Sequence, residues 1–204
     1  MLRLVAWVYI MEPIAEPTAV AVHAVNRGAV RCGDTAAILG CGPIGLLTLQ
    51  AFRAAGGTRA VCVDGIASRR IKAAELGADM TIEPGPACEI LRDTADVVFE
   101  TAGSSAATAA AFALAQPGGR VVQVGWPEKN GVELDVAGFL EKELDYVGVN
   151  RYADAFPAAI QWLADGRVRG DVLITHRFPF DRVAEAFQFA LEHRMEAIKV
   201  MVLN

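Results

Sequence analysis

Residues 38–47 read "ILGCGPIGLL", and this stretch decides how the whole chain is interpreted. Gly40, Gly42 and Gly45 form a GxGxxG pattern between one apolar run and a second that is rich in leucine. In such a loop the first glycine permits a tight turn, the second lets the backbone approach a pyrophosphate, and the third lets a helix pack on a strand. A helix that begins there offers free N–H groups and its positive dipole end to phosphates. The pattern predicts a dinucleotide site, although glycine-rich turns of this kind also serve packing alone.

A carboxylate further along the chain supports the dinucleotide prediction. The apolar run at 59–63 is a predicted strand that ends at Asp64, about 20 residues after the last glycine. A carboxylate at this position accepts hydrogen bonds from the adenine-ribose hydroxyls and repels a 2′-phosphate, which favours NAD over NADP. Arg69 and Arg70 weaken this preference because arginine can bind that phosphate, but Arg70 is better explained as part of a solvated helix face.

The composition limits the classes of protein to consider. The chain has 204 residues, 53% of them hydrophobic, and a net charge of -5, which indicates one well-buried domain with at most a small appendage. The absence of a Lys/Arg block argues against nucleic-acid binding. The four cysteines lie singly, which favours a reduced, cytoplasmic protein with buried thiols. The first eleven residues are too short to span a membrane and lack a cleavage site, so we expect a strand or an exposed stub there.

Short apolar runs alternate with alanine- and leucine-rich stretches of helical period. This alternation is typical of a doubly wound α/β domain, in which helices cover both faces of a parallel sheet. The flanks fit the pattern less well: we expect a helix with Pro17 in its first turn before the core, and an extended run, a helix from Asp181 and a last strand after it. The predicted core strands are 35–39, 59–63, 80–82, 96–100, 119–125 and 144–150, and the predicted core helices are 43–55, 68–76, 104–115 and 153–164.

From Glu16 to the C-terminus the sequence resembles the zinc-containing medium-chain dehydrogenases, most closely those that act on sorbitol and other polyols. The resemblance implies a Rossmann domain with its leading helix over 16–170, preceded by a stub at 1–15. It also implies that 171–204 belongs to a GroES-like catalytic domain. The segments that carry it are "EPTAVAVHAV", "LGCGPIGLLTL", "VDGIASRRIKAAELGAD", "FETAGSSAA", "GGRVVQVGW", "GVNRYADAFPAAIQWLADG" and "LITHRFPFDRVAEAF".

The resemblance assigns roles to particular residues. The loop, with Pro43 and Ile44, would hold the pyrophosphate, while Asp64 and Arg69 would hold the adenosine end. Arg151 and Tyr152 match positions that hydrogen-bond the substrate hydroxyls in polyol dehydrogenases. Two segments would flank the nicotinamide ring, and Asn150 in the second stands where an aromatic residue is expected: Val124, Gly125 and Trp126, and Val149, Asn150 and Arg151.

Glu16 is the single residue to which the resemblance assigns the most specific role. It matches the acidic residue that lies beside the catalytic zinc in polyol dehydrogenases, either as a ligand or hydrogen-bonded to the zinc-bound water. From the residues alone, Glu16 is better explained as a carboxylate at a helix start or in solvent, and the resemblance is what favours the zinc role. His23, His176 and His193 are isolated, and we expect them to be structural or surface groups.

The resemblance also implies a reaction, namely hydride transfer between a polyol or secondary alcohol and NAD. In that family zinc is held mainly by an N-terminal half, and this sequence begins where that half would end. Glu16 alone cannot hold zinc, which needs about three protein ligands, so we expect zinc only if the other half is supplied. A fragment, a mis-started product and half of a split enzyme all remain open. The alternative function is a catalytically silent NAD-binding or self-associating module.

Two segments predict self-association. "GVELDV" at 131–136 resembles the edge strand through which these dehydrogenases pair their sheets, and open edges invite pairing. The C-terminal helix and strand carry apolar side chains that would lack a surface to cover them. We therefore expect a homodimer or homotetramer. The residues concerned are Val132, Leu134 and Val136 near the two-fold axis, and Phe187, Leu191, Val200 and Val202 in the C-terminal segment.

Overall fold

A computed structural model describes the backbone of residues 2–127 and 131–204, and the side chains from residue 13 onward except residues 87 and 128–130. Its centre is a six-stranded sheet with the order β3-β2-β1-β4-β5-β6, in which every neighbouring pair is parallel. This order is that of a dinucleotide-binding Rossmann sheet and confirms the predicted doubly wound α/β fold. The strands are β1 Thr35–Leu39, β2 Arg59–Val63, β3 Met80–Ile82, β4 Ala95–Glu100, β5 Ala115–Gln123 and β6 Asp145–Gly148.

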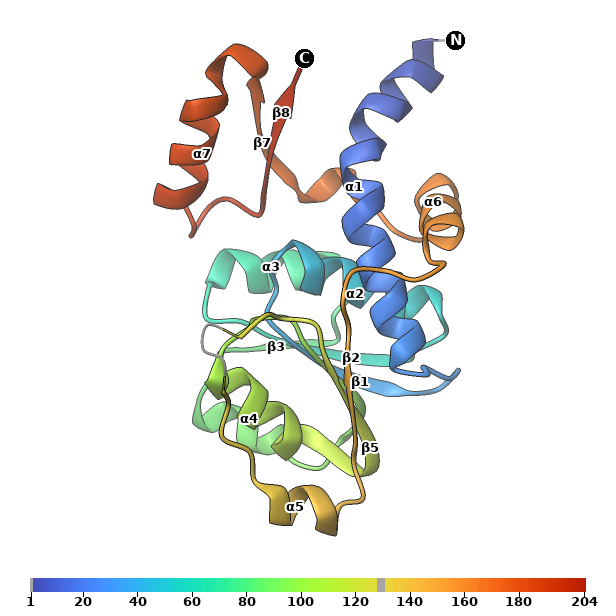
Figure 1. The fold of residues 1–204 in the computed structure, drawn as a ribbon, viewed down its shortest axis with the longest axis vertical. Helices are drawn as coiled ribbons and strands as arrows, with labels where there is room; N and C mark the ends of the chain where they lie inside the picture. Colours follow the sequence, from blue (N-terminus) through green and yellow to red (C-terminus); the bar gives the residue numbers. More distant parts are fainter. Residues whose placement is uncertain (1, 128–130) are drawn as a thin grey trace.

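Helices cover both faces of the sheet (Figure 1). Helices α2 (Pro43–Ala54) and α3 (Ala67–Glu75) lie on one face, while α4 (Ser105–Leu114) and α5 (Val136–Glu141) lie on the other. Alternate residues of each strand point to opposite faces. Ile38 and Phe99 therefore join the cluster beneath α2, whereas Leu39 and Val98 join the cluster beneath α4. Because both faces of the central strands β1, β2 and β4 are buried, these strands are almost continuously apolar.

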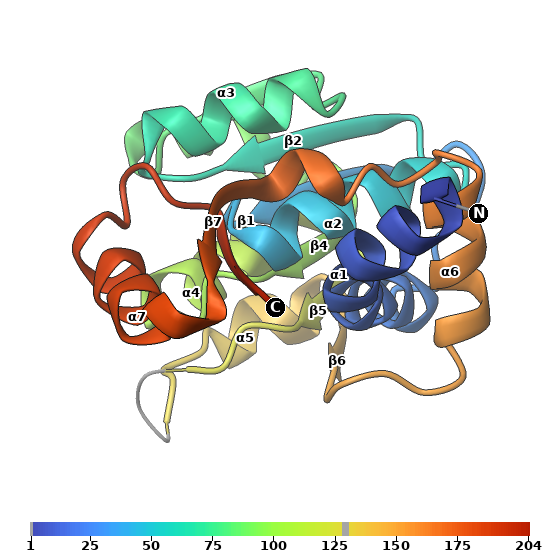
Figure 2. The same ribbon diagram turned by 90° about the horizontal axis from the view of Figure 1, so that it is seen from above.

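The start of the chain differs from the sequence prediction. One helix, α1, runs from Leu2 to Arg27 and includes Pro13 and Pro17, so the strand considered for the first eleven residues and a separate helix starting near Pro17 are wrong. Proline fits the helical φ but loses one backbone hydrogen bond. Burial of Ile14, Ala21 and Val25 in the cluster shared with α2 offsets that loss. Figure 2 shows α1 beside α6 (Phe156–Ala164). No helix in the described part of the chain is both long and apolar enough to cross a membrane.

A second difference lies at 131–136, where we expected an edge strand. Residues 131–135 form neither helix nor strand, and Val136 is the first residue of α5. The Asp135 side chain accepts a hydrogen bond from the Gly138 N–H at 3.0 Å and so caps α5, which begins at the last residue of the expected strand. Leu134 packs against the cluster beneath α4 rather than lying in a sheet.

Two smaller differences concern element ends. Strand β5 begins at Ala115, ahead of Pro117, because a register shift between Ala95 and Val97 lets it pair with β4 earlier than expected. Helix α6 begins at Phe156 rather than near residue 153, after Asp154 adopts a φ of 51°. A left-handed residue cannot continue a helix.

The C-terminal residues form a separate small lobe. Strands β7 (Ile174–Pro179) and β8 (Lys199–Leu203) make a two-stranded parallel sheet, and α7 (Val183–Glu192) connects them. The lobe lies beyond α3, away from the six-stranded sheet (Figure 1). Leu173, Ile174 and Met201 are buried in the same cluster as α2, so the lobe rests on the larger unit. Short 3-10 turns complete the described elements: η1 Pro86–Leu91, η2 Asp171–Leu173 and η3 Phe180–Arg182.

Candidate functional site

Two glycines of the 40–45 loop are required by the fold itself. Gly40 has a φ of 97°, and a Cβ there would lie 2.9 Å from the amide nitrogen of Ala102. A Cβ on Gly45 would collide with the carbonyl oxygen of Gly40. Any side chain at either position would push β1, α2 and the turn after β4 apart.

Gly42 is different, because no contact among the described residues requires a glycine there. Its φ is -72°, which any residue adopts, and no atom of the described residues lies within 4 Å of a Cβ built there. Gly42 is also the N-cap of α2, and its position leaves the first turn without a side-chain cap. Open space above uncapped helical N–H groups fits a phosphate group.

Asp64 is fixed at the end of β2 by the backbone. Its side chain is 8% exposed, Oδ2 accepts a hydrogen bond from the Cys41 N–H at 2.7 Å, and Oδ1 accepts one from the Ile66 N–H at 2.7 Å. Each carboxylate oxygen has a further acceptor site. Asp64 therefore ties the glycine loop to β2 and retains the capacity to accept ribose hydroxyls.

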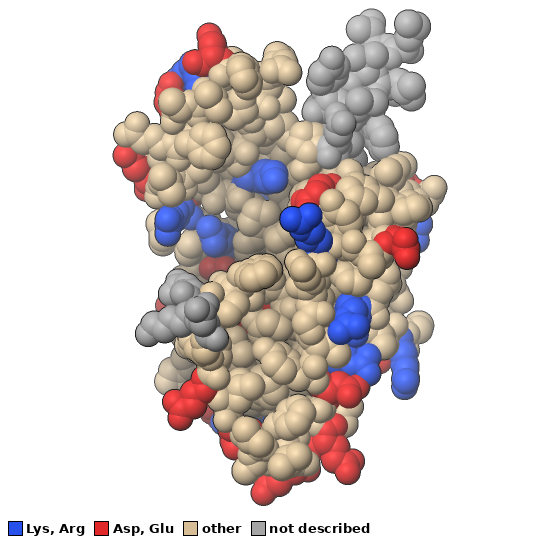
Figure 3. Space-filling view, in the orientation of Figure 1, with Lys and Arg blue, Asp and Glu red and all other residues tan. Residues whose placement is uncertain are grey.

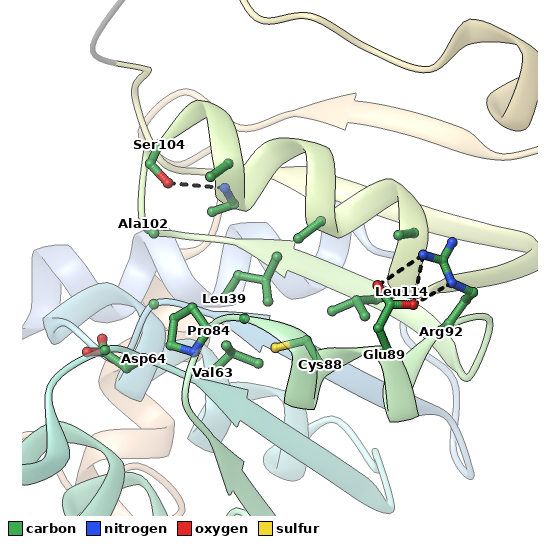
Figure 4. Close-up of a pocket in the computed structure, with 17 residues that line it drawn as sticks. Leu39, Val63, Asp64, Pro84, Cys88, Glu89, Arg92, Ala102, Ser104 and Leu114 are labelled. Atoms are coloured by element: carbon green, nitrogen blue, oxygen red, sulfur yellow. Dashed lines mark hydrogen bonds and ion pairs between the residues drawn. The ribbon is translucent and has the colours of Figure 1, made fainter.

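A cavity of about 460 Å³ opens beside Asp64, between η1 and α4 (Figure 4). Gly40, Asp64 and Ala102 line one end, where the strands stop, and the ion pair between Glu89 and Arg92 lies at the other end. The wall from α4 is made almost entirely of alanines, so the cavity is apolar. Glu89 is paired with Arg92, which leaves Asp64 as the carboxylate of this largely apolar cavity that can bind a ligand, and such a site suits a nucleoside.

A second cavity, of about 800 Å³, lies on the other side of the turn after β4. It brings Glu16 of α1 together with residues from four other segments of the chain. The arrangement agrees with the expected grouping of Glu16, Arg151 and the two segments around the nicotinamide. The lining residues are Glu16, Val20, Ile44, Thr101, Val124, Gly125, Trp126, Val149, Asn150 and Arg151.

The surroundings of Glu16 do not fit a zinc ion by themselves. Glu16 is exposed on α1, well inside the helix rather than at its start, so the explanation as a helix-start carboxylate is wrong. Among the described residues that line its cavity, Glu16 is the one with a side chain that commonly binds zinc. No group of three or more His, Cys, Asp or Glu side chains in the described ranges could hold a metal. Zinc at Glu16 needs ligands from elsewhere.

Some predicted site residues lie apart from both cavities. Tyr152 packs edge-on against Phe156, with ring centroids 4.7 Å apart, and does not line the second cavity although Arg151 does. Arg69 donates from Nη2 to the Arg194 carbonyl at 3.1 Å, so it faces the C-terminal lobe. Arg70 donates to the Asp64 carbonyl at 2.7 Å, which is a structural contact rather than a free helix face. Figure 3 shows Lys and Arg side chains gathered between the lobe and the sheet, where they attract anions.

The remaining predicted residues have structural surroundings. His176 and His193 lie on either side of Phe189, at centroid distances of 4.3 and 4.1 Å. Burial lowers the pKa of His23, and the positive charge of Arg27 lowers it further. The expectation of buried thiols holds for two of the four cysteines, Cys41 and Cys62, whereas Cys88 is half-buried and Cys32 exposed.

Sequence reasoning missed Glu100, the last residue of β4. Its side chain is fully buried, and its carboxylate accepts hydrogen bonds from the N–H groups of Ala102 at 2.9 Å and Gly103 at 2.8 Å and from Gln123 Nε2. Burial raises the pKa of Glu100, while these three donors act in the opposite direction. A carboxylate inside an otherwise apolar strand is the signal that could have revealed it, because charged side chains are buried only with partners.

Comparison with known proteins gives a consistent result. The model of the zinc-binding dehydrogenase family matches residues 43–165. Sorbitol dehydrogenase of Bacillus subtilis is 34% identical over 196 residues, which cover 93% of this chain and 56% of the relative. The chain thus spans little more than half the length of the curated relatives it matches.

Solved structures agree with the sequence comparison. A short chain alcohol dehydrogenase of Escherichia coli in complex with NADH superposes with a TM-score of 0.86 at 28% identity, covering 94% of this chain and 58% of that one. A Sinorhizobium meliloti protein assigned to the zinc-binding dehydrogenases and bound to NADP gives a TM-score of 0.84 at 30% identity, covering 93% and 58%. Structural neighbours therefore include proteins with either nicotinamide cofactor.

Proposed function

Since the chain belongs to the zinc-binding dehydrogenase family, we propose that it binds NAD(H) as the cofactor-binding part of a polyol or alcohol dehydrogenase. When bound, NAD accepts a hydride from the alcohol carbon. The chain's own contribution is to hold the dinucleotide across the carboxyl ends of β1, β2, β4 and β5.

Gly42 is the observation that carries this proposal. Gly40 and Gly45 have reasons within the fold, whereas at Gly42 a side chain would meet only open space above the start of α2. A ligand that needs the backbone to come close, such as a pyrophosphate, accounts for a glycine there. The loop with Pro43 and Ile44 would bind this group, and Asp64 would accept the adenosine ribose hydroxyls and favour NAD over NADP.

The cavity around Glu16 supports the proposed substrate end. It joins the segments expected beside the nicotinamide to Glu16 and Arg151, a carboxylate and a guanidinium that can hydrogen-bond hydroxyl groups of a polyol. Arg151 adopts a φ of 58°, a conformation that usually persists only where surrounding structure requires it. In this proposal Glu16 and Arg151 orient the substrate, while Tyr152 supports Arg151 from the neighbouring cluster with Phe156.

We further propose that residues 171–204 belong to the catalytic part of the complete enzyme. Phe187, Leu191 and Met195 are exposed by 69%, 63% and 62% on and just after α7, and an exposed apolar face of this kind suits a protein partner. Zinc ligands, together with Glu16, would come from that partner. The same face is the observation in favour of the alternative function, a self-associating module that forms a homodimer or homotetramer. Sedimentation of the purified chain at micromolar concentration, with and without Leu191→Lys, separates a monomer from such an assembly.

The proposal is tested by titrating NADH into the wild-type chain, Gly42→Ala and Gly131→Ala. Both substitutions introduce a Cβ that no described atom approaches within 4 Å, so neither is expected to lower the melting temperature. Gly42→Ala should weaken NADH binding by about tenfold or more because its methyl group occupies the space of the pyrophosphate. Gly131, which lines neither cavity, serves as the control, and Gly131→Ala should bind NADH as the wild type does. Equal NADH affinity of all three proteins, or no binding by any, would refute the proposal.

A further inference from the structure

The turn after β4 divides the two cavities. Thr101 lines the larger cavity with Glu16, while Ala102 and Ser104 line the smaller cavity with Asp64. A dinucleotide bound as proposed above places its two halves on opposite sides of this turn. The position of the turn therefore sets how well both halves fit at once.

One buried side chain fixes the turn to the sheet. The Glu100 carboxylate accepts the N–H groups of Ala102 and Gly103 on the side of the turn, and Gln123 Nε2 on the side of β5. Gln123 Nε2 also donates to the carbonyl of Gly125 at 2.8 Å. Glu100 and Gln123 together thus connect the wall of the smaller cavity to Gly125 in the wall of the larger one.

The backbone around Glu100 is closely packed. The Glu100 carbonyl accepts hydrogen bonds from the N–H groups of Val124 and Gly125, both at 2.8 Å. A Cβ on Gly125 would lie 2.7 Å from Glu100 Oε2, and one on Gly103, whose φ is 73°, would collide with the carbonyl of Trp126. The turn and the 124–126 segment are therefore in direct contact above the carboxylate, with no space for either to shift alone.

We propose that Glu100 is a positioning residue that holds the adenosine and nicotinamide cavities at the separation a whole dinucleotide requires. This inference rests on the proposed NAD site. Glu100 touches neither cavity, so its effect passes through the turn and through Gln123. Loss of the carboxylate should therefore weaken NADH, which spans both cavities, more than ADP-ribose, which lacks the nicotinamide.

The test compares NADH and ADP-ribose affinities, by calorimetry, for the wild type, Glu100→Gln and Asp96→Asn. Glu100→Gln keeps the size of the side chain but turns an amide N–H toward Gln123 Nε2, so donor faces donor. Asp96 is the matched control: it lies at the other end of β4 and accepts hydrogen bonds from Thr35 N–H at 2.8 Å, Thr35 Oγ1 at 2.8 Å and Gln116 Nε2 at 2.7 Å. Loss of the Asp96 carboxylate should lower the stability of the protein without changing the position of either cavity.

We expect Glu100→Gln to weaken NADH binding about tenfold while ADP-ribose changes less than about threefold. Asp96→Asn should leave the ratio of the two affinities unchanged even if its melting temperature falls. If Glu100→Gln does not fold, Gln123→Met removes the same connection from the β5 side and should give the same selective loss. Equal changes for both ligands, or none, would overturn the inference. Failure of the wild type to bind either ligand would instead refute the proposed NAD site and the inference with it.

Discussion

The six-stranded unit and the C-terminal lobe use similar segments but bury them to different extents. In β1 every residue after the first is buried, and in β4 only Asp96 is not. In β8 only Met201 is buried, and in β7 only Ile174. Helix α2 buries most of its residues, whereas α7 buries only Ala186.

This difference in burial indicates that the six-stranded unit is stabilised by its own contacts, whereas the C-terminal lobe is not. In the six-stranded unit, helices on both faces cover the strands, and each face has its own apolar cluster. A lobe of fewer than about 40 residues rarely buries enough apolar surface to be stable alone in water. We infer that the lobe depends on the larger unit at its base and on another surface at α7.

The largest expected effect is a separation of cofactor binding from catalysis. The purified 204-residue chain should bind NADH through the six-stranded unit but show no zinc-dependent oxidation of sorbitol, xylitol or secondary alcohols. The reason is that Glu16 is one candidate ligand, and a catalytic zinc needs about three. Production of NADH, followed by absorbance with added zinc and after chelation, measures this. Robust turnover that a chelator abolishes would contradict it.

The next largest effect should appear in stability, when one leucine is truncated in each region. Leu47→Ala in α2 removes a fully buried side chain and should lower the free energy of unfolding by about 2–5 kcal/mol. Leu191→Ala in α7, 63% exposed, should change it by less than about 0.5 kcal/mol. Urea unfolding of the two variants gives both values. Similar losses would mean that the lobe is as tightly integrated as the core.

The preference for NADH over NADPH depends on a residue of the six-stranded unit, Asp64, and so tests that unit alone. Asp64→Ala should weaken NADH binding by about tenfold, since hydrogen bonds to a charged group are lost, and should weaken NADPH less because a repelling charge is removed. Calorimetric titration with both cofactors gives the ratio. Wild-type binding of NADPH as tight as that of NADH would contradict the assignment of Asp64.

The smallest effect should be the contribution of Glu100 to the pH dependence of stability, which comparison with Glu100→Gln isolates from that of other titrating groups. Burial raises its pKa in the folded protein above the ordinary value of 4.5. The folded state then holds the proton more firmly than the unfolded state, so this contribution to stability is fully present below pH 4.5 and is lost as the pH rises through the raised pKa. The difference in unfolding free energy between wild type and Glu100→Gln should therefore fall over that interval. A constant difference between pH 4 and pH 8 would show that Glu100 does not titrate there.

Much of the six-stranded unit follows from local patterns. The strands 35–39, 59–63 and 80–82 have the bounds that the apolar runs predict. In the first two, every residue after the first is buried, whereas 80–82 is a short edge strand without a buried residue. The glycine loop and Asp64 could also be predicted, because their spacing is fixed by one β-α-β unit. The grouping of Glu16 with Arg151 was expected from the family resemblance and not from any local pattern, because the two residues meet in one cavity but lie far apart in the sequence.

The errors also have physical causes. Prolines suggested that a helix starts near Pro17, but packing on α2 outweighs local propensity and α1 continues through both. The 131–136 segment has the alternation of a strand, with Val132 and Leu134 half-buried between exposed neighbours, but no neighbouring strand in the described part of the chain pairs with it. A carboxylate inside an apolar strand could have marked Glu100 as a paired side chain, but its partners, the turn at 102–103 and Gln123 of β5, lie in other segments that this pattern does not identify.

The parallel pairing of β1 has a kinetic consequence. In β1, Ala36 pairs with Ala60 of β2 on one side and with Val97 of β4 on the other. The second edge of β1 therefore stays uncovered until β4 has been synthesised and has docked. Contacts this distant in sequence slow folding, because long loops must close first. During synthesis the glycine loop exists before Ala102 and Thr101 do, and both cavities form only when β4 docks. A nucleotide that binds these cavities can stabilise the protein only after β4 has docked. It should therefore slow unfolding without changing the rates of the earlier folding steps.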